Sequence, residues 1–263
     1  EKNMATVINT NMASIYAQNN LSAAQGKLAT SVQRLSSGLR INSAKDDSAG
    51  LAISMGMQSQ IYGIEQANRN LSDIIGMAQV TETALSTIQD MLLRLKTLGT
   101  QSGNSALSAG QRSQITTEAA ALVSQIGLTR SEAVYNGINL VGVSAGTTYG
   151  VQSGVSTGTT IDFITANATI STTSTSFTSI DTDLLNISSE RAKMGAIISR
   201  ATYSSTNLLS QVANLSQARS AIVDTDFATE TASLTKGQIM QQASTAMLAQ
   251  ANQMPNVILS LLK

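Results

Sequence analysis

The sequence contains no cysteine, no histidine and no tryptophan. Without cysteine and histidine it lacks thiol nucleophiles, thiolate and imidazole metal ligands, and the histidine base of a hydrolytic triad. Aromatic residues make up only 3% of the chain, so a core has to be built from Leu, Ile, Val, Met and Ala. Such a core suits packed helices better than a β-sandwich. The composition therefore predicts a helical protein and removes most familiar enzyme chemistry. We expect a protein that is not an enzyme and that holds neither a cofactor nor a metal.

An excess of charge of either sign is also missing, because 16 Lys and Arg residues balance 16 Asp and Glu residues. A neutral chain has no overall field that would attract nucleic acid or an anionic membrane. No apolar run reaches the roughly eighteen residues of a transmembrane helix, and residues 1–21 lack the basic and apolar regions of a signal peptide. We expect no nucleic-acid partner, no membrane span and no cleaved signal peptide.

Both ends of the chain are long uncharged segments, residues 3–26 and 238–262. Apolar residues recur there at helical spacing and predict a contact stripe at each end. The stripe residues are Leu21, Leu28 and Leu35 at the N-terminal end, and Met240, Met247, Ala251, Met254, Ile258 and Leu261 at the C-terminal end. We predict two interface helices that pack against each other and against further copies of the chain. The alternative is a pair of ordinary core helices in a monomer.

The C-terminal stripe contains polar interruptions and the single proline of the chain, Pro255. Glutamine and asparagine oppose membrane insertion, whereas an uncharged helix can be buried by other helices on several sides. Proline cannot donate the helical hydrogen bond, at a cost of about 3 kcal/mol in a helix interior. We therefore expect a kink or an early end of the last helix at Pro255.

Between the ends, one stretch alternates steps of three and four between apolar positions, a period of 3.5 that is typical of coiled-coil-like packing. Its members are Leu71, Ile74, Ala78, Thr81, Leu85, Ile88, Leu92 and Leu95. A second stripe runs from Leu184 to Ile222, and we expect the two to pack antiparallel. A shorter amphipathic stretch, residues 115–126, follows the breaker-rich turn 99–110 and predicts a third helix.

The centre changes character at Val134, where Asn136 and Gly137 lie between apolar residues and predict a hairpin. The following residues, 142–179, are rich in Ser, Thr and Gly, with strand-like pieces at 148–152, 159–164 and 169–170. A disordered Ser/Thr linker is the alternative. The predicted fold class is mainly α, a long coiled-coil-like helical bundle formed by the N- and C-terminal segments, with a small central β-hairpin region.

One run, residues 34–53, reads RLSSGLRINSAKDDSAGLAI. In structural terms, Gly38 is suited to end one helix, and Ser43 with Asp46 and Asp47 to cap the next. The run also closely resembles the signature of bacterial flagellin. The same is true of VINTN at residues 7–11, ISSERAKMGA at 187–196 and LAQANQMP at 248–255. The resemblance covers about residues 4–141 and 180–262 and leaves the Ser/Thr-rich centre unmatched.

The resemblance implies a filament subunit of the short, two-domain form, without large outer domains. Residues 1–43 and 223–263 would be the halves of an inner core domain. Residues 44–133 and 180–222 would be the N-terminal helices and the C-terminal helix of a middle bundle domain. Residues 134–179 would be a variable β-rich surface segment. The stripe residues of both ends would form the filament-core interface, and the ends would fold on assembly.

The resemblance also implies partners and a location. The chain would leave the cell through the flagellar type III export apparatus and become part of an extracellular filament. Its partners would be copies of itself, an export chaperone, and filament cap and junction proteins. Arg94, Leu98 and Glu118 resemble the epitope through which a host Toll-like receptor senses flagellins, although Thr97 and Leu122 depart from the usual acidic and basic residues.

Other functions can be weighed against this one. A hook-filament junction protein or a flagellin-related adhesin would share the terminal helices without elongating. A zinc peptidase inserted at the centre would need histidines that the chain does not have. The carboxylates of Asp224, Asp226 and Glu230 are better interpreted as charges at the start of the last helix than as metal ligands.

Overall fold

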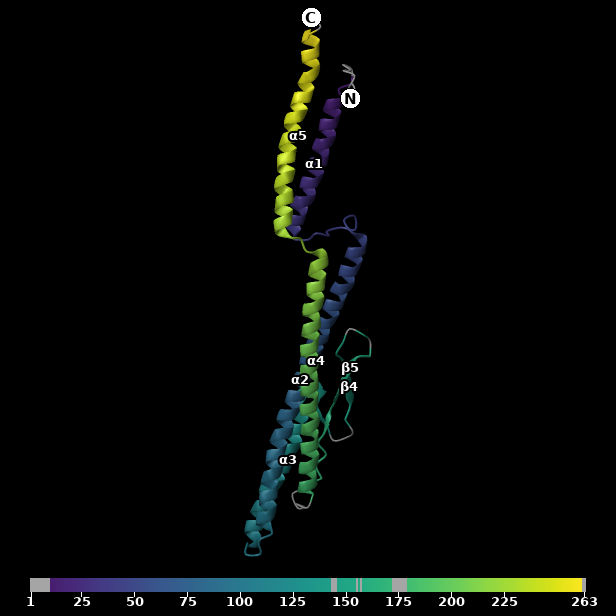
Figure 1. The fold of residues 1–263 in the computed structure, drawn as a ribbon. Coiled ribbons are helices and arrows are strands. Elements are labelled where there is room, and N and C mark those ends of the chain that lie inside the picture. Colours follow the sequence, from purple (N-terminus) through teal and green to yellow (C-terminus); the bar gives the residue numbers. More distant parts are fainter. Residues whose placement is uncertain (1–9, 143–145, 155, 157, 172–178, 262–263) are drawn as a thin grey trace. The chain divides into compact units, whose positions relative to one another are not determined.

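The computed structural model describes residues 10–142, 146–154, 156, 158–171 and 179–261. In chain order its helices are α1 (Met12–Ser37), α2 (Ser48–Ser102), α3 (Ala109–Glu132), α4 (Ile180–Val223) and α5 (Phe227–Leu261) (Figure 1). The strands are β1 (Val134–Tyr135), β2 (Ile138–Asn139), β3 (Val141–Gly142), β4 (Thr148–Gln152), β5 (Thr160–Ile164) and β6 (Ala166–Asn167). The chain divides into two compact units, residues 1–58 with 216–263, and residues 59–215. The predicted fold class is confirmed.

The core of the unit 59–215 is formed by the apolar stripes of α2 and α4, as the spacing of their apolar residues predicted. All eight members of the α2 stripe between Leu71 and Leu95 are completely buried. Ile187, Met194 and Ala201 of α4 are completely buried in the same cluster. Thr81 fits into this apolar row because its hydroxyl donates to the Met77 carbonyl at 2.8 Å, which satisfies the buried oxygen.

Polar bridges show the relative direction of α2 and α4. Arg191 Nε donates to Glu82 Oε1 at 2.8 Å, and Ser205 Oγ donates to Asn68 Oδ1 at 2.6 Å. Residue numbers rise along α4 as they fall along α2, so the predicted antiparallel packing is confirmed. The third helix, α3, contributes Ile115, Ala119 and Ile126 to the same core.

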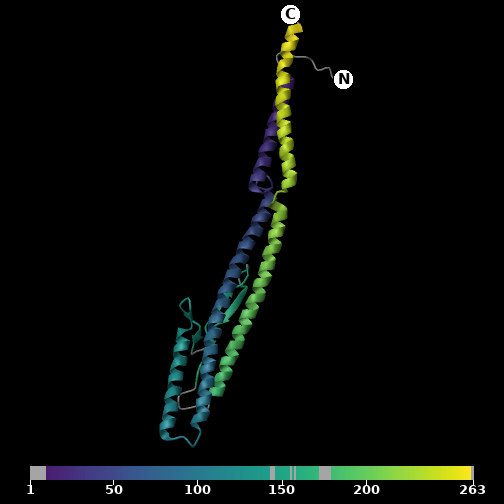
Figure 2. The same cartoon turned by 90° about the vertical axis from the view of Figure 1, so that its left-hand side faces the viewer.

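The centre forms short paired strands beside these helices. Asn136 and Gly137 have φ of 46° and 80° and make the tight turn between β1 and β2, as the sequence predicted. Strands β4 and β5 form a second antiparallel hairpin, and Figure 2 shows this small β region alongside the helices of its own unit. Ile161 and Phe163 of β5 are buried in the helical core. Alternate side chains of β5 therefore point into the bundle, as expected for a strand with one buried face.

The third predicted strand, residues 169–170, is wrong. A strand occurs earlier instead, at β6, which pairs in parallel with β3. The last ladder bond comes from Ala168 N–H to the Gly142 carbonyl at 3.1 Å, and the Thr169 hydroxyl then turns back to Asn167 Oδ1 at 2.6 Å.

Helix ends in the unit formed by residues 1–58 and 216–263 follow the predicted caps. Gly38 ends α1 with φ of 71°, and its N–H donates to the Arg34 carbonyl at 2.8 Å. Asp47, the residue before α2, accepts at its Oδ1 the N–H of Gly50 in the first turn of that helix, at 2.9 Å. The expectation of an early end at Pro255 is wrong, because α5 continues to Leu261.

Candidate assembly interface

Helices α1 and α5 form an antiparallel pair (Figures 1 and 2). Along α1 the buried positions are Ala17, Ala24 and Ser31, spaced by seven residues. Along α5 they are Glu230, Gly237, Ser244 and Ala251, with the same spacing. Half-buried residues fill the remaining seam positions: Ser14, Leu21, Leu28 and Leu35 on α1, and Leu234, Gln241 and Leu248 on α5. The pair is a two-stranded coiled coil whose most buried positions carry mostly small side chains.

Small seam residues bring the two helices close together. A Cβ placed on Gly237 would lie 3.5 Å from Leu28 Cδ1 and 3.7 Å from Leu28 Cα, so the two backbones nearly touch there. Close contact of small side chains buries little apolar area, and the hydrophobic stabilisation scales with that area. We therefore expect little hydrophobic stabilisation from the contact between α1 and α5 alone.

The end of the pair near Gly38 is polar. Arg34 Nη1 lies 3.7 Å from Glu230 Oε2, and Glu230 is itself buried. Asp226 caps α5 by accepting the Ala228 N–H at 2.9 Å and the Thr229 hydroxyl at 2.7 Å. These bonds hold the pKa of Asp226 below its ordinary value, the Thr229 hydroxyl having the largest effect. The carboxylates near the start of α5 thus act as cap and ion-pair partner.

The two connections beside this end are joined to each other. Leu39 and Asp224 form an antiparallel bridge, and Thr225 N–H donates to the Gly38 carbonyl at 2.9 Å. On the other side of the signature run, Asp46 Oδ2 accepts from the Ser43 hydroxyl and from the N–H groups of Asn42 and Ser43. These bonds lower the pKa of Asp46, and the bond from the Ser43 hydroxyl has the largest effect. The residues of the flagellin-like run thus act here as caps and turn formers.

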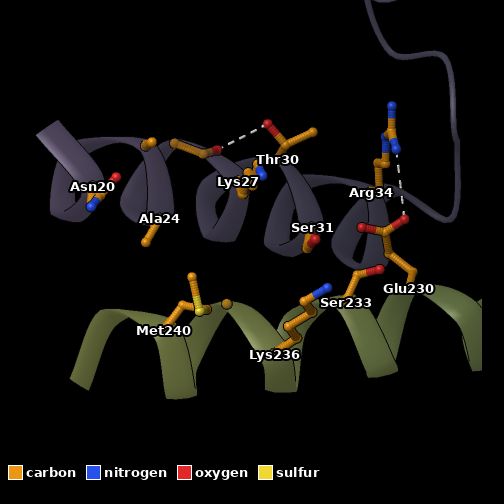
Figure 3. A pocket seen from close by; sticks show the side chains of 13 residues that line it. Asn20, Ala24, Lys27, Thr30, Ser31, Arg34, Glu230, Ser233, Lys236 and Met240 are labelled. Atoms are coloured by element: carbon orange, nitrogen blue, oxygen red, sulfur yellow. Dashed lines mark hydrogen bonds and ion pairs between the residues drawn. The ribbon is translucent and has the colours of Figure 1, made fainter. Parts of the chain in front are cut away.

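Two grooves run along the α1–α5 pair. One, of about 710 Å³, is shown in Figure 3 between Lys27 and Arg34 of α1 and Glu230 and Lys236 of α5. The other, of about 300 Å³, is lined by Tyr16 and by Met240, Met247 and Met254 among others. The first groove carries three basic residues and one acidic residue among small and polar ones, and the second is mostly apolar.

The structure separates the predicted stripe residues into two groups. Leu21, Leu28, Leu35 and Ala251 lie on the seam between α1 and α5. Met240, Met247 and Met254 lie outside the seam and are 50%, 65% and 56% exposed. The side chains of Ile258 and Leu261 lie outside the described residues. The predicted C-terminal stripe does not follow the seam of α5, because Gly237 and Ser244 on that seam are not apolar. Their seven-residue spacing with Ala251 is the available signal in the sequence.

The residues that resemble a receptor epitope lie in the unit 59–215. Arg94 Nε and Nη2 donate to Glu118 Oε1 at 2.9 and 2.6 Å, and both side chains are about half exposed. Leu98 is only 1% exposed and belongs to the core. Arg94 and Glu118 therefore form a surface ion pair, whereas Leu98 supports the helix beneath it.

None of the helices in the described ranges is both long and apolar enough to cross a bilayer. Residues 8–145 match the family model for the bacterial flagellin N-terminal helical region, and residues 177–262 match that for the bacterial flagellin C-terminal helical region.

Several curated relatives align along nearly their whole length. Flagellin FlaB1 of Treponema pallidum is 34% identical, with 98% of this chain and 100% of the relative covered. A flagellin of Xenorhabdus nematophila is 33% identical over 99% of this chain and 100% of its own length. A flagellar filament 33 kDa core protein of Treponema phagedenis is 34% identical over 98% of this chain and 100% of its own length. The similarity thus spans both units and the centre.

Proposed function

This chain belongs to the bacterial flagellin family and is a flagellar filament subunit, and we propose that its paired ends α1 and α5 are the surface through which copies join. Flagellin is a family of structural proteins, not of enzymes. The observation that carries the proposal is the arrangement of the ends. The most buried seam positions carry mostly small residues and the seam leucines are only half-buried, whereas other large apolar residues, such as Met247 and Tyr16, are exposed outside the seam.

The apolar residues outside the seam remain largely exposed in the pair. Met247 is 65% exposed, Tyr16 is 63% exposed and Ile239 is 60% exposed. The described part of α1 and α5 carries only Lys27, Arg34, Glu230 and Lys236 as charged residues. Exposed apolar surface without nearby charge is typical of a face that another protein covers. A second copy of the chain is the partner that the filament supplies.

Assembly through such ends would be coupled to their folding. A helix pair that buries little apolar area gains little stability from pairing alone, and most helix stability in proteins comes from tertiary packing. Neighbouring copies that cover Met240, Met247 and Met254 would add the missing burial. The terminal helices would therefore gain their full order in the filament.

The domain roles follow from the same proposal. Residues 1–43 and 223–263 would form the inner core of the filament, residues 44–133 and 180–222 the next shell, and residues 134–179 the outer surface. The subunit would travel through the flagellar export apparatus with a chaperone and meet cap and junction proteins at the filament ends. A host Toll-like receptor would contact Arg94 and Glu118, and its binding to a Glu118→Ala variant would test that contact.

The test of the assembly surface is seeded polymerisation. Purified wild-type chain, Met247→Asp and Ile164→Asp would be mixed with short filament seeds and followed by negative-stain electron microscopy and circular dichroism. Ile164 is a matched control, because it is 45% exposed and lies on strand β5 of the centre. Wild type and Ile164→Asp are expected to elongate with a gain of helix, and Met247→Asp is expected not to elongate.

Two results would count against the proposal. Normal elongation of Met247→Asp would remove the stripe from the interface. Short capped ends in place of long wild-type filaments would favour the hook-filament junction protein or the adhesin.

A further inference from the structure

We infer that Asn11 is a positioning residue that supplies, from α1, the hydrogen bond that Pro255 removes from α5. The inference rests on the proposed function for its assembly readout, but its geometry is independent of that function. The helical conformation of the last part of α5 would then depend on pairing with α1.

The feature begins with a missing donor. In an α-helix the N–H of each residue donates to the carbonyl four residues earlier, so residue 255 would donate to Ala251. Proline has no N–H group. Residue 255 nevertheless lies well inside α5, which runs from Phe227 to Leu261. The Ala251 carbonyl therefore needs a donor from elsewhere.

The side chain of Asn11 provides this donor. Its Nδ2 donates to the Ala251 carbonyl at 2.7 Å, across a sequence separation of 240 residues. Its Oδ1 accepts the Ser14 N–H at 3.1 Å and makes Asn11 the N-cap of α1. The two bonds use opposite ends of one amide, so only one orientation of the amide satisfies both. Asn11 thus starts one helix and repairs the other with the same group.

Burial of Ala251 increases the contribution of this hydrogen bond to stability. Ala251 is a seam residue and is only 6% exposed. A carbonyl that loses both its helical donor and its access to water is strongly unfavourable in a folded protein. When α1 is absent, the last part of α5 has to leave this carbonyl to water. Pro255 and Asn11 together therefore favour the paired state over an isolated α5.

The neighbouring contact gives a matched control. Ser14 Oγ donates to Asn252 Oδ1 at 2.8 Å, but this bond is exposed and involves no missing helix donor. Asparagine at position 11 differs from serine in the reach of its donor, whereas both residue types are good N-caps. Asn11→Ser therefore keeps the cap and removes the bond to Ala251.

The experiment is a double-mutant cycle on the full-length chain. Wild type, Asn11→Ser, Pro255→Ala and Asn11→Ser/Pro255→Ala would be compared by the critical concentration for seeded elongation. Asn11→Ser is expected to raise it roughly 5- to 10-fold when Pro255 is present. Pro255→Ala restores the helical N–H, so the same change there is expected to raise it less than about 2-fold. Ser14→Ala is expected to have the same small effect in both backgrounds.

Equal effects of Asn11→Ser in the two backgrounds would overturn the inference, because Asn11 would then act only as a cap. The same cycle would be measured as the midpoint of thermal helix loss by circular dichroism in whichever form the wild-type chain adopts. If wild type does not elongate at all, the proposed function fails. The thermal cycle then still decides the role of Asn11, through the presence or absence of rescue by Pro255→Ala.

Discussion

The two units of the chain make opposite kinds of helix contact. In residues 59–215, the Leu and Ile side chains of the α2 stripe from Leu71 to Leu95 are completely buried, and each contributes about 1.5–3 kcal/mol when removed from water. In the α1–α5 pair the most buried seam positions are mostly Ala, Ser and Gly, the seam leucines are only half-buried, and the methionines of α5 are exposed outside the seam. A coiled-coil period is present in both. We therefore expect the size of the most buried side chains, not the period, to decide whether a helix pair is stable without neighbouring copies of the chain.

The largest test of this comparison pairs a substitution in each unit. Leu92→Ala should destabilise the bundle by about 2–5 kcal/mol, because Leu92 is completely buried and its loss leaves a cavity. Leu28→Ala, on the seam of α1, should leave thermal unfolding of the monomer nearly unchanged and raise the critical concentration for assembly. Circular dichroism melts and seeded elongation would measure the two effects. A similar loss of monomer stability from both substitutions would break the comparison.

A second test changes the closeness of the seam. Gly237→Leu should overpack the contact with Leu28 and destabilise filaments by about 1–3 kcal/mol. Gly237→Ala should fit, since its Cβ would lie at ordinary contact distance, and should stabilise α5 by about 0.5–1 kcal/mol. Gly195→Leu on α4 is the control, because nothing lies within 4 Å of a Cβ there. Thermal depolymerisation would rank the variants, and full tolerance of Gly237→Leu would show that close approach is not required.

The smallest expected effect concerns acid. The folded pKa of Asp226 lies below its unfolded value of about 3.9, so its stabilising effect is present above that pH and is lost as pH falls through the folded pKa. Asn also caps helices but does not titrate in this range. Filaments of Asp226→Asn should therefore dissociate at a slightly lower pH than wild-type filaments in an acid titration followed by light scattering. An unchanged midpoint would show that α5 capping does not limit acid stability.

The helix contacts of the unit 59–215 can be predicted from the sequence far better than those of the α1–α5 pair, for a physical reason. The α2 stripe was found because Leu71 to Leu95 are large and apolar at a period of 3.5. The α5 seam was missed because Gly237 and Ser244 carry no hydrophobic signal, and the more conspicuous methionines lie outside it. The early end expected at Pro255 was wrong because the compensating donor, Asn11, lies 240 residues from its acceptor. Local propensity cannot report such a distant partner.

That separation has a consequence for the order of events in the life of the chain. Among the described helices α1 packs on α5, so this pair can close only after the residues of α5 have been made. A chain cut short before α5 would retain the residues of the 59–215 core but would offer α1 nothing to pair with. The contact between α1 and α5 therefore links two segments that are made at opposite ends of synthesis of this chain.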